Sequence, residues 1–281
     1  MKVLVTGAAG QLGCDVVEEL ESRQHEAIGV DIEQLDITDK VAVYIFIKEL
    51  QPDAVIHCAA YTAVDGAEDN VDICKLVNAK GTENIALTCK EFDIPMMYIS
   101  TDYVFNGEGN QEWNPEDIRN PINVYGQSKY EGELFVEKLK KSFIVRISWV
   151  FGKNGNNFVK TMLKVAKSRD SLTVVNDQIG SPTYTYDLAK LLCDMIVTDK
   201  YGKYHATNEG FCSWYEYACE IFRQAGICIN ILPVRSDEYP VKAKRPKNSR
   251  MSKDKLTENG FKKLPQWNDA LSRYLKELGE I

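Results

Sequence analysis

The chain has 281 residues, 44% hydrophobic and 27% charged, with a formal net charge of −7 at pH 7. This length suits one large domain, or a nucleotide-binding domain with a smaller second lobe, and the composition is that of a soluble protein. The acidic charge argues against nucleic acid or an anionic membrane as a general partner, and no apolar run approaches the roughly 18 residues of a membrane span.

The first half of the chain alternates short apolar runs with amphipathic helical patterns. The apolar runs predict buried parallel strands at 3–6, 27–31, 54–58, 96–100 and 143–148. Helical periodicity predicts helices at 11–22, 40–50, 71–92 and 125–140. Such alternation is typical of an α/β protein with a doubly wound, parallel Rossmann-type sheet.

The second half is less regular. Its patterns predict a strand at 172–175, a loop at 237–252, and helices at 185–198, 214–225 and 267–278. We therefore expect a Rossmann-type domain at residues 1–150. Residues 151–281 would form mainly a smaller, discontinuous substrate-binding lobe, with some segments returning to the first domain.

Eight cysteines are spread along the chain without a Cys-x-x-Cys pair. Their spacing does not suggest zinc, and a chain of this size does not need disulfides for stability. We expect reduced thiols, a cytoplasmic location and no bound metal.

A glycine-rich turn joins the first predicted strand to the first helix. The segment Gly7-Ala8-Ala9-Gly10-Gln11-Leu12-Gly13 has the pattern GxxGxxG. Glycine permits a tight turn and lets a phosphate approach the backbone, while the helix start offers free N–H groups to a pyrophosphate. In this position the pattern predicts a dinucleotide site contacted by Gly7, Gly10, Gln11 and Leu12.

Asp31 ends the second predicted strand, where a carboxylate can accept both hydroxyls of the adenosine ribose. It would also repel the 2′-phosphate of NADP, and no arginine follows closely. The sequence thus favours NADH and leaves NADPH open; alternatively, Asp31 only caps a turn. Further cofactor contacts are expected for the adenine edge at Asp36 and Ile37, and for the phosphates or nicotinamide ribose at Ala59, Ala60, Tyr61 and Thr62.

Tyr125 and Lys129 stand one helical turn apart. A tyrosine with its ordinary pKa of about 10 is a poor acid, and a lysine on the same helix face can lower that pKa. The Thr101 hydroxyl can share the substrate oxygen with Tyr125 and polarise a carbonyl. With the nucleotide signature upstream, the three predict hydride transfer to or from an oxygen-bearing carbon. Without that signature, Tyr125 and Lys129 could be an ordinary amphipathic helix start.

Together these motifs resemble those of the dTDP-4-dehydrorhamnose reductase family, within the extended short-chain dehydrogenase/reductase superfamily. The resemblance spans essentially the whole chain and is carried by residues 7–13, 59–65, 100–105, 123–129, 146–151, 155–158, 177–183, 245–250 and 264–267. It implies an NADH- or NADPH-dependent oxidoreductase that reduces the 4-keto group of dTDP-4-dehydro-β-L-rhamnose, the last step of dTDP-L-rhamnose biosynthesis. The dTDP-sugar would be the small-molecule partner of a monomer or homodimer.

The resemblance also implies roles for single residues. Tyr125 would donate the proton, Lys129 would tune it and hold the nicotinamide ribose, and Thr101 would polarise the ketone. The sugar pocket would include Asp102 and Trp149, with weaker substrate contacts at Asn157, Gln178 and Arg250. Some relatives dimerise through a magnesium site built from glutamates; the comparable helix here has no glutamate cluster, so we predict no metal.

A basic run at residues 242–253 stands out in this acidic chain. Arginine can grip a phosphate with two hydrogen bonds, so the run suggests a partner for the diphosphate of a nucleotide sugar. Arg250, and less strongly Arg245, are the expected members, the other interpretation being a solvated loop.

Two other kinds of function stay open. The first is another enzyme of the superfamily, either a nucleotide-sugar 4-epimerase or a reductase that makes a different deoxysugar. The second is a non-catalytic regulatory subunit built on the same fold. The presence of Tyr125, Lys129 and Thr101 together favours an enzyme.

Overall fold

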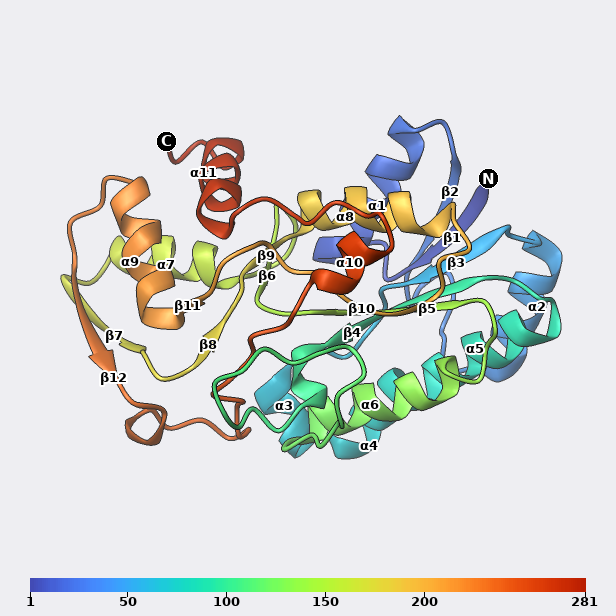
Figure 1. Cartoon of the computed structure of the whole chain (residues 1–281), viewed down its shortest axis with the longest axis horizontal. Helices are drawn as coiled ribbons and strands as arrows, with labels where there is room; N and C mark the ends of the chain where they lie inside the picture. Colours follow the sequence, from blue (N-terminus) through green and yellow to red (C-terminus); the bar gives the residue numbers. More distant parts are fainter.

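In the computed structural model, which describes residues 1–281, six parallel strands form the central sheet (Figure 1). Their order is β10-β5-β4-β3-β1-β2, and every neighbouring pair is parallel. The strands are β1 Lys2–Thr6, β2 Glu26–Val30, β3 Ala54–His57, β4 Met96–Thr101, β5 Ser142–Ile147 and β10 Gly202–His205. The predicted doubly wound α/β sheet is confirmed.

Helices cover both faces of this sheet. One face carries α1 (Gln11–Ser22) and α8 (Thr185–Ile196), and the other carries α2 (Lys40–Leu50), α5 (Thr82–Glu91) and α6 (Val124–Val136). Successive side chains of β1 point to opposite faces, so Val3 and Val5 join the α1–α8 core while Leu4 joins the other. Burial on both faces explains why the strands read as unbroken apolar runs.

The segment predicted as one helix over 71–92 is helical but not uniform. It consists of α4 (Val71–Lys75), a π-helical turn at Leu76–Gly81, and α5. Asn78 in the π turn is fully buried and donates to Ser128 Oγ of α6 at 3.0 Å. The π turn shifts the backbone hydrogen bonds by one residue, which side-chain periodicity does not reveal. The short helix α3 (Val64–Asp69) before it was not predicted.

The second lobe packs around three helices at the left of Figure 1, namely α7 (Phe158–Ala166), α9 (Trp214–Gln224) and α11 (Trp267–Glu277). Its core contains Phe151, Tyr217 and Tyr274. Three two-stranded ladders support it: β6 (Val150–Phe151) with β9 (Thr183–Tyr184), β7 (Ser171–Val175) with β12 (Asn230–Val234), and β8 (Ile179–Gly180) with β11 (Cys212–Ser213).

The chain passes between the lobes more than once. After β9 it returns to the first lobe for α8 and β10, and after β12 it returns again for α10 (Asp254–Glu258), which lies against β10. Helix α11 then closes the second lobe. None of the helices has both the length and the apolar character needed to cross a membrane, and all eight cysteines are free thiols.

Gly13 lets α1 pack directly onto the glycine turn. A Cβ at this position would lie 2.1 Å from the Gly7 carbonyl oxygen and 2.8 Å from its carbon. We expect Gly13→Ala to lower the free energy of unfolding by about 1–3 kcal/mol, the range for overpacking. Where there is room, the same substitution in a helix raises stability by about 1 kcal/mol, so urea unfolding tests the sign. A variant more stable than the wild type would contradict this packing.

Candidate active site

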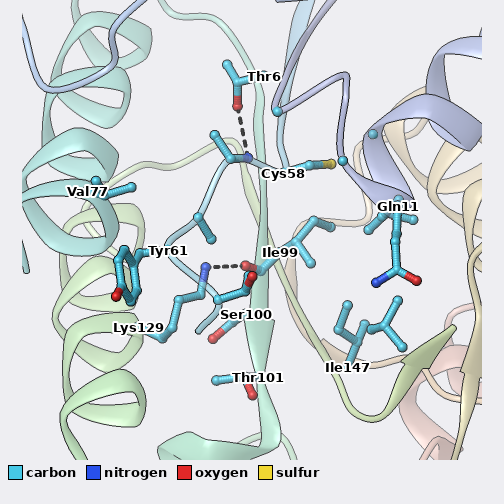
Figure 2. A pocket seen from close by; sticks show the side chains of 18 of the residues that line it. Thr6, Gln11, Cys58, Tyr61, Val77, Ile99, Ser100, Thr101, Lys129 and Ile147 are labelled. Carbon is cyan, nitrogen blue, oxygen red and sulfur yellow. Dashed lines mark hydrogen bonds between the residues drawn. The ribbon is translucent and has the colours of Figure 1, made fainter. Parts of the chain in front are cut away.

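A cavity of about 1000 Å³ opens at the carboxyl ends of strands β1 to β5. The chain reverses its direction across the sheet between β1 and β3, and such a switch point is where doubly wound proteins bind nucleotides. Figure 2 shows side chains that line the cavity, with Tyr61 and Lys129 on one side and Gln11 and Ile147 on the other. Nearly all lining residues belong to the first lobe and the turn that leaves β5. Val150 of β6 and Trp214 of α9 are the contributions of the second lobe.

The glycine turn forms one wall of the cavity. Gly7 has φ +68°, and a Cβ there would lie 2.7 Å from the Ala59 backbone, so only glycine fits. Gly10 precedes α1 without a side-chain cap, which leaves the first N–H groups of the helix available to an anion. Gly7, Gly10, Gln11 and Leu12, the residues predicted to contact a dinucleotide, all line the cavity. These features fit the pyrophosphate of a dinucleotide.

Asp31 lies directly after β2 at the far end of the cavity. Its carboxylate accepts the Ala9 N–H at 3.1 Å and the Ile32 N–H at 2.8 Å, so it is held against the glycine turn. Asp36 and Ile37 line the same end, and residues Ala59 to Thr62 line the middle of the cavity. Among all lining residues, Lys129 is the one lysine or arginine. No cation therefore lies beside Asp31 to receive a 2′-phosphate.

Thr101, Tyr125 and Lys129 meet at the opposite end. Thr101 ends β4, while Tyr125 and Lys129 lie on α6, which the buried Asn123 side chain caps by accepting the Gly126 N–H at 2.7 Å. The Lys129 ammonium donates to the Ile99 carbonyl at 2.7 Å (Figure 2). The same ammonium lies 4.1 Å from the ring centre of Tyr98. The three residues that the sequence analysis grouped therefore line one cavity.

The protonation of this site differs from the sequence-based expectation. Burial, and then the charge of Asp102, raise the pKa of Tyr125 above its ordinary value, although the Thr101 hydroxyl opposes the rise. Burial lowers the pKa of Lys129 to about 7. We expected Lys129 to lower the pKa of Tyr125, but its hydrogen bond goes to the Ile99 carbonyl instead. A phenol that stays protonated at neutral pH suits a proton donor.

Asp102 and Trp149 also line the cavity. Asp102 accepts the Thr101 hydroxyl at 3.0 Å and the Ser249 hydroxyl at 2.5 Å. Burial raises the pKa of Asp102 to about 6, despite these two hydrogen bonds. Ser249 lies far along the chain, so its contact with the site could not be inferred from local sequence.

Trp149 stacks on Trp214 across the boundary of the lobes. Their ring centres are 3.7 Å apart, with 16° between the planes. Trp149 has φ +49°, a conformation that a bulky residue rarely adopts and that the surrounding packing must enforce. Gly180 makes room, because a Cβ there would lie 2.9 Å from the Trp149 ring. We did not predict Trp214, since an aromatic residue at the start of an amphipathic helix looks like an ordinary core residue.

Three predicted substrate residues do not line the cavity. Asn157 caps α7 through Lys160 N–H at 3.1 Å and donates to Gln11 Oε1 at 3.1 Å. Gln178 donates to Ser236 Oγ at 3.0 Å, and Arg250 donates to Asn248 Oδ1 at 2.9 Å. The polar groups of these three side chains are thus engaged in contacts within the protein, in the second lobe or in the 242–253 segment.

The basic run at 242–253 also differs from expectation. Carboxylates pair with four of its cations: Lys242 with Asp69 at 2.5 Å, Arg245 with Asp65 at 2.7 Å, Lys247 with Asp177 at 2.8 Å, and Lys253 with Glu209 at 3.6 Å. Asp65 and Asp69 belong to α3. Lys242 and Arg245 therefore attach residues 242–253, the linking segment between β12 and α10, to the first lobe. None of the cations of this segment lines the cavity.

The chain is similar to known proteins along almost its whole length. The family model described as RmlD substrate binding domain matches residues 1–280. The chain is 42% identical over 277 residues to the spore coat polysaccharide biosynthesis protein SpsK of Bacillus subtilis (strain 168), covering 98% of this chain and 97% of that one. It is 41% identical over 285 residues to the dTDP-4-dehydrorhamnose reductase of Aggregatibacter actinomycetemcomitans, covering 96% and 97%. The crystal structure of the dTDP-4-dehydrorhamnose reductase from Bacillus anthracis in complex with NADP has a TM-score of 0.95 and 45% identity, covering 99% and 100%.

Asp31 is the residue expected to set the preference between NADH and NADPH. We expect the wild-type protein to bind NADH more tightly than NADPH, because the Asp31 carboxylate repels a 2′-phosphate. Asp31→Asn keeps a hydrogen-bond acceptor for the glycine turn and removes the charge. It should shift the ratio of the two dissociation constants about tenfold toward NADPH, as expected for one nearby charge pair. Fluorescence titration measures both constants.

Asp36→Asn is the matched control, since Asp36 lines the same end of the cavity. We expect it to leave the ratio of the two dissociation constants unchanged. An unchanged ratio in Asp31→Asn as well would remove Asp31 from cofactor selection.

Proposed function

This chain belongs to the RmlD substrate binding domain family, that of the dTDP-4-dehydrorhamnose reductases in the extended short-chain dehydrogenase/reductase superfamily, and we propose that it reduces dTDP-4-dehydro-β-L-rhamnose to dTDP-β-L-rhamnose with NADH or NADPH. One observation carries this proposal. The hydroxyl of Thr101, the phenol of Tyr125 and the ammonium of Lys129 share a single cavity with the glycine turn. A 4-keto sugar and a nicotinamide can therefore be held side by side.

Each residue of the site would have a separate role in the reduction. The nicotinamide cofactor supplies a hydride to C4 of the sugar. Tyr125 donates its proton to the C4 oxygen. The Thr101 hydroxyl, turned from Asp102 to the substrate, donates a hydrogen bond to the same oxygen, so that negative charge developing there is neutralised. Lys129, whose ammonium is held by the Ile99 carbonyl, would hold the nicotinamide ribose.

The sugar would lie against Asp102 and the stacked pair of Trp149 and Trp214. The broad indole faces suit the apolar face of a 6-deoxysugar, while Asp102 can accept a hydrogen bond from a sugar hydroxyl. Arg250 and Arg245 receive no part in this proposal, because neither lines the cavity.

Turnover with a defined substrate tests the function. We expect NADH or NADPH to be oxidised in equal amount to added dTDP-4-dehydro-β-L-rhamnose, with dTDP-β-L-rhamnose identified by NMR. An epimerase would give no net oxidation of the cofactor, and a product of different C4 configuration would indicate another deoxysugar. Cofactor binding without any turnover would support a regulatory subunit.

Tyr125→Phe tests the proton donor. We expect it to lower kcat by about 10²-fold or more, the range for loss of general acid catalysis, with the dissociation constant of NADH nearly unchanged. Tyr130→Phe, on the same helix and stacked under Arg119 at 4.6 Å, should keep wild-type turnover. Wild-type turnover in Tyr125→Phe itself would refute the assignment.

Trp214→Ala tests the aromatic wall. Loss of the stack with Trp149 should raise KM for the dTDP-sugar about 3- to 10-fold, the value of one aromatic pair, and leave NADH affinity unchanged. Trp214→Phe keeps an aromatic face and should recover most of the loss. Equal KM values for Trp214→Ala and the wild type would show that the sugar does not depend on this pair.

A further inference from the structure

Glu133 is a buried carboxylate on the helix that carries Tyr125 and Lys129. It lies one turn beyond Lys129 and two turns beyond Tyr125 on α6, and it is completely inaccessible to solvent. It accepts four hydrogen bonds: from Ser100 Oγ at 2.5 Å, from Arg146 Nε and Nη2 at 2.8 Å each, and from Arg119 Nη1 at 2.7 Å. A buried charge is tolerated only with such complete pairing.

The partners of Glu133 come from three different parts of the fold. Ser100 precedes Thr101 on β4, Arg146 lies on β5, and Arg119 lies in the loop before α6. Arg146 is itself fully buried, and its Nη1 donates to the Pro115 carbonyl at 2.8 Å and lies 3.3 Å from His205 Nε2. One carboxylate therefore fixes α6 against the two strands that end at the active site.

Glu133 is also the carboxylate whose charge acts on Lys129, one helical turn away. Burial raises the pKa of Cys58 to about 12 and lowers the pKa of His57 to about 3, so the last residue of β3 and the residue after it are both neutral. Burial also raises the pKa values of Cys74 on α4 and Tyr98 on β4. Tyr125 is neutral for the reason given above.

Burial alone would raise the pKa of Glu133, but the charge and hydrogen bonds of Arg146, together with those of Ser100 and Arg119, bring it below its ordinary value. Glu133 is therefore ionised throughout the neutral range. Its charge favours the protonated form of Lys129, against the larger effect of burial.

We propose that Glu133 is a positioning residue, which through Ser100 and Arg146 sets Tyr125 and Lys129 opposite Thr101 and supplies the counter-charge of the Lys129 ammonium. The proposal rests on the proposed function only for the roles of these three residues. Glu133 does not line the cavity and has no contact with cofactor or sugar to make.

The test uses the pH dependence of NADH binding, which needs no sugar substrate. The wild-type dissociation constant should rise as Lys129 loses its proton, with an inflection near pH 7, where burial has brought the Lys129 pKa. In Glu133→Gln the counter-charge is lost and Arg146 and Arg119 remain, so the inflection should move to lower pH by about one unit or more. The kcat for the dTDP-sugar should fall at least tenfold.

Glu137→Gln is the matched control. Glu137 lies one turn further along and pairs with Arg119 at 2.7 Å and Lys203 at 3.0 Å, at the partly exposed edge of the same ion-pair network. It should keep the wild-type inflection and kcat. An inflection in Glu133→Gln that stays at the wild-type pH would overturn the proposal. If no preparation reduces a dTDP-sugar but the inflection moves as described, the proposed function fails while the role of Glu133 stands.

Glu133→Asp separates charge from position and covers the case in which Glu133→Gln does not fold. The shorter side chain keeps the charge but cannot reach Ser100 and both Arg146 nitrogens at once. We expect an inflection close to the wild-type pH and a kcat reduced several-fold. Wild-type kcat in Glu133→Asp would contradict the positioning role of the Glu133 hydrogen bonds. An inflection displaced as far as in Glu133→Gln would contradict the effect of the Glu133 charge on Lys129.

Discussion

The ion pair between Glu133 and Arg146 is the interaction on which the arrangement of the active site depends. Both side chains are fully buried, and separating such a pair costs about 3–5 kcal/mol, because the remaining charge has no partner. That amount is a large part of the stability of an ordinary domain. The pair therefore holds α6, which carries Tyr125, against β5, and the Ser100 hydroxyl adds a bond to β4, which carries Thr101.

Much of the fold and part of the site could be predicted because the signals are local. Val3 to Thr6 reads as a buried strand from its composition, and Gly7 to Gly13 reads as a phosphate-binding turn from its spacing. Tyr125 and Lys129 could be paired because both lie on one helix, where a separation of four residues fixes a shared face. Thr101 required one more inference, that parallel strands end at the same edge of a sheet.

What escaped prediction depends on contacts between distant residues. Ser249 meets Asp102, and Trp214 meets Trp149, only after the linking segment and the second lobe have folded over the first. The basic run looked like a phosphate site because the sequence shows its cations but not the carboxylates of α3 that pair with them. The raised pKa of Tyr125 follows from burial, which no spacing of residues reports.

Because the chain passes repeatedly between the lobes, neither lobe is one continuous segment that could be exchanged as a unit. Helix α8 and strand β10 complete the first lobe from within the sequence of the second, and α10 again lies against β10. No single cut separates the whole first lobe from the whole second lobe. Under the proposed function, new sugar specificity would therefore arise from changes within loops and helix starts, such as the one that bears Trp214, and not from recombination of modules.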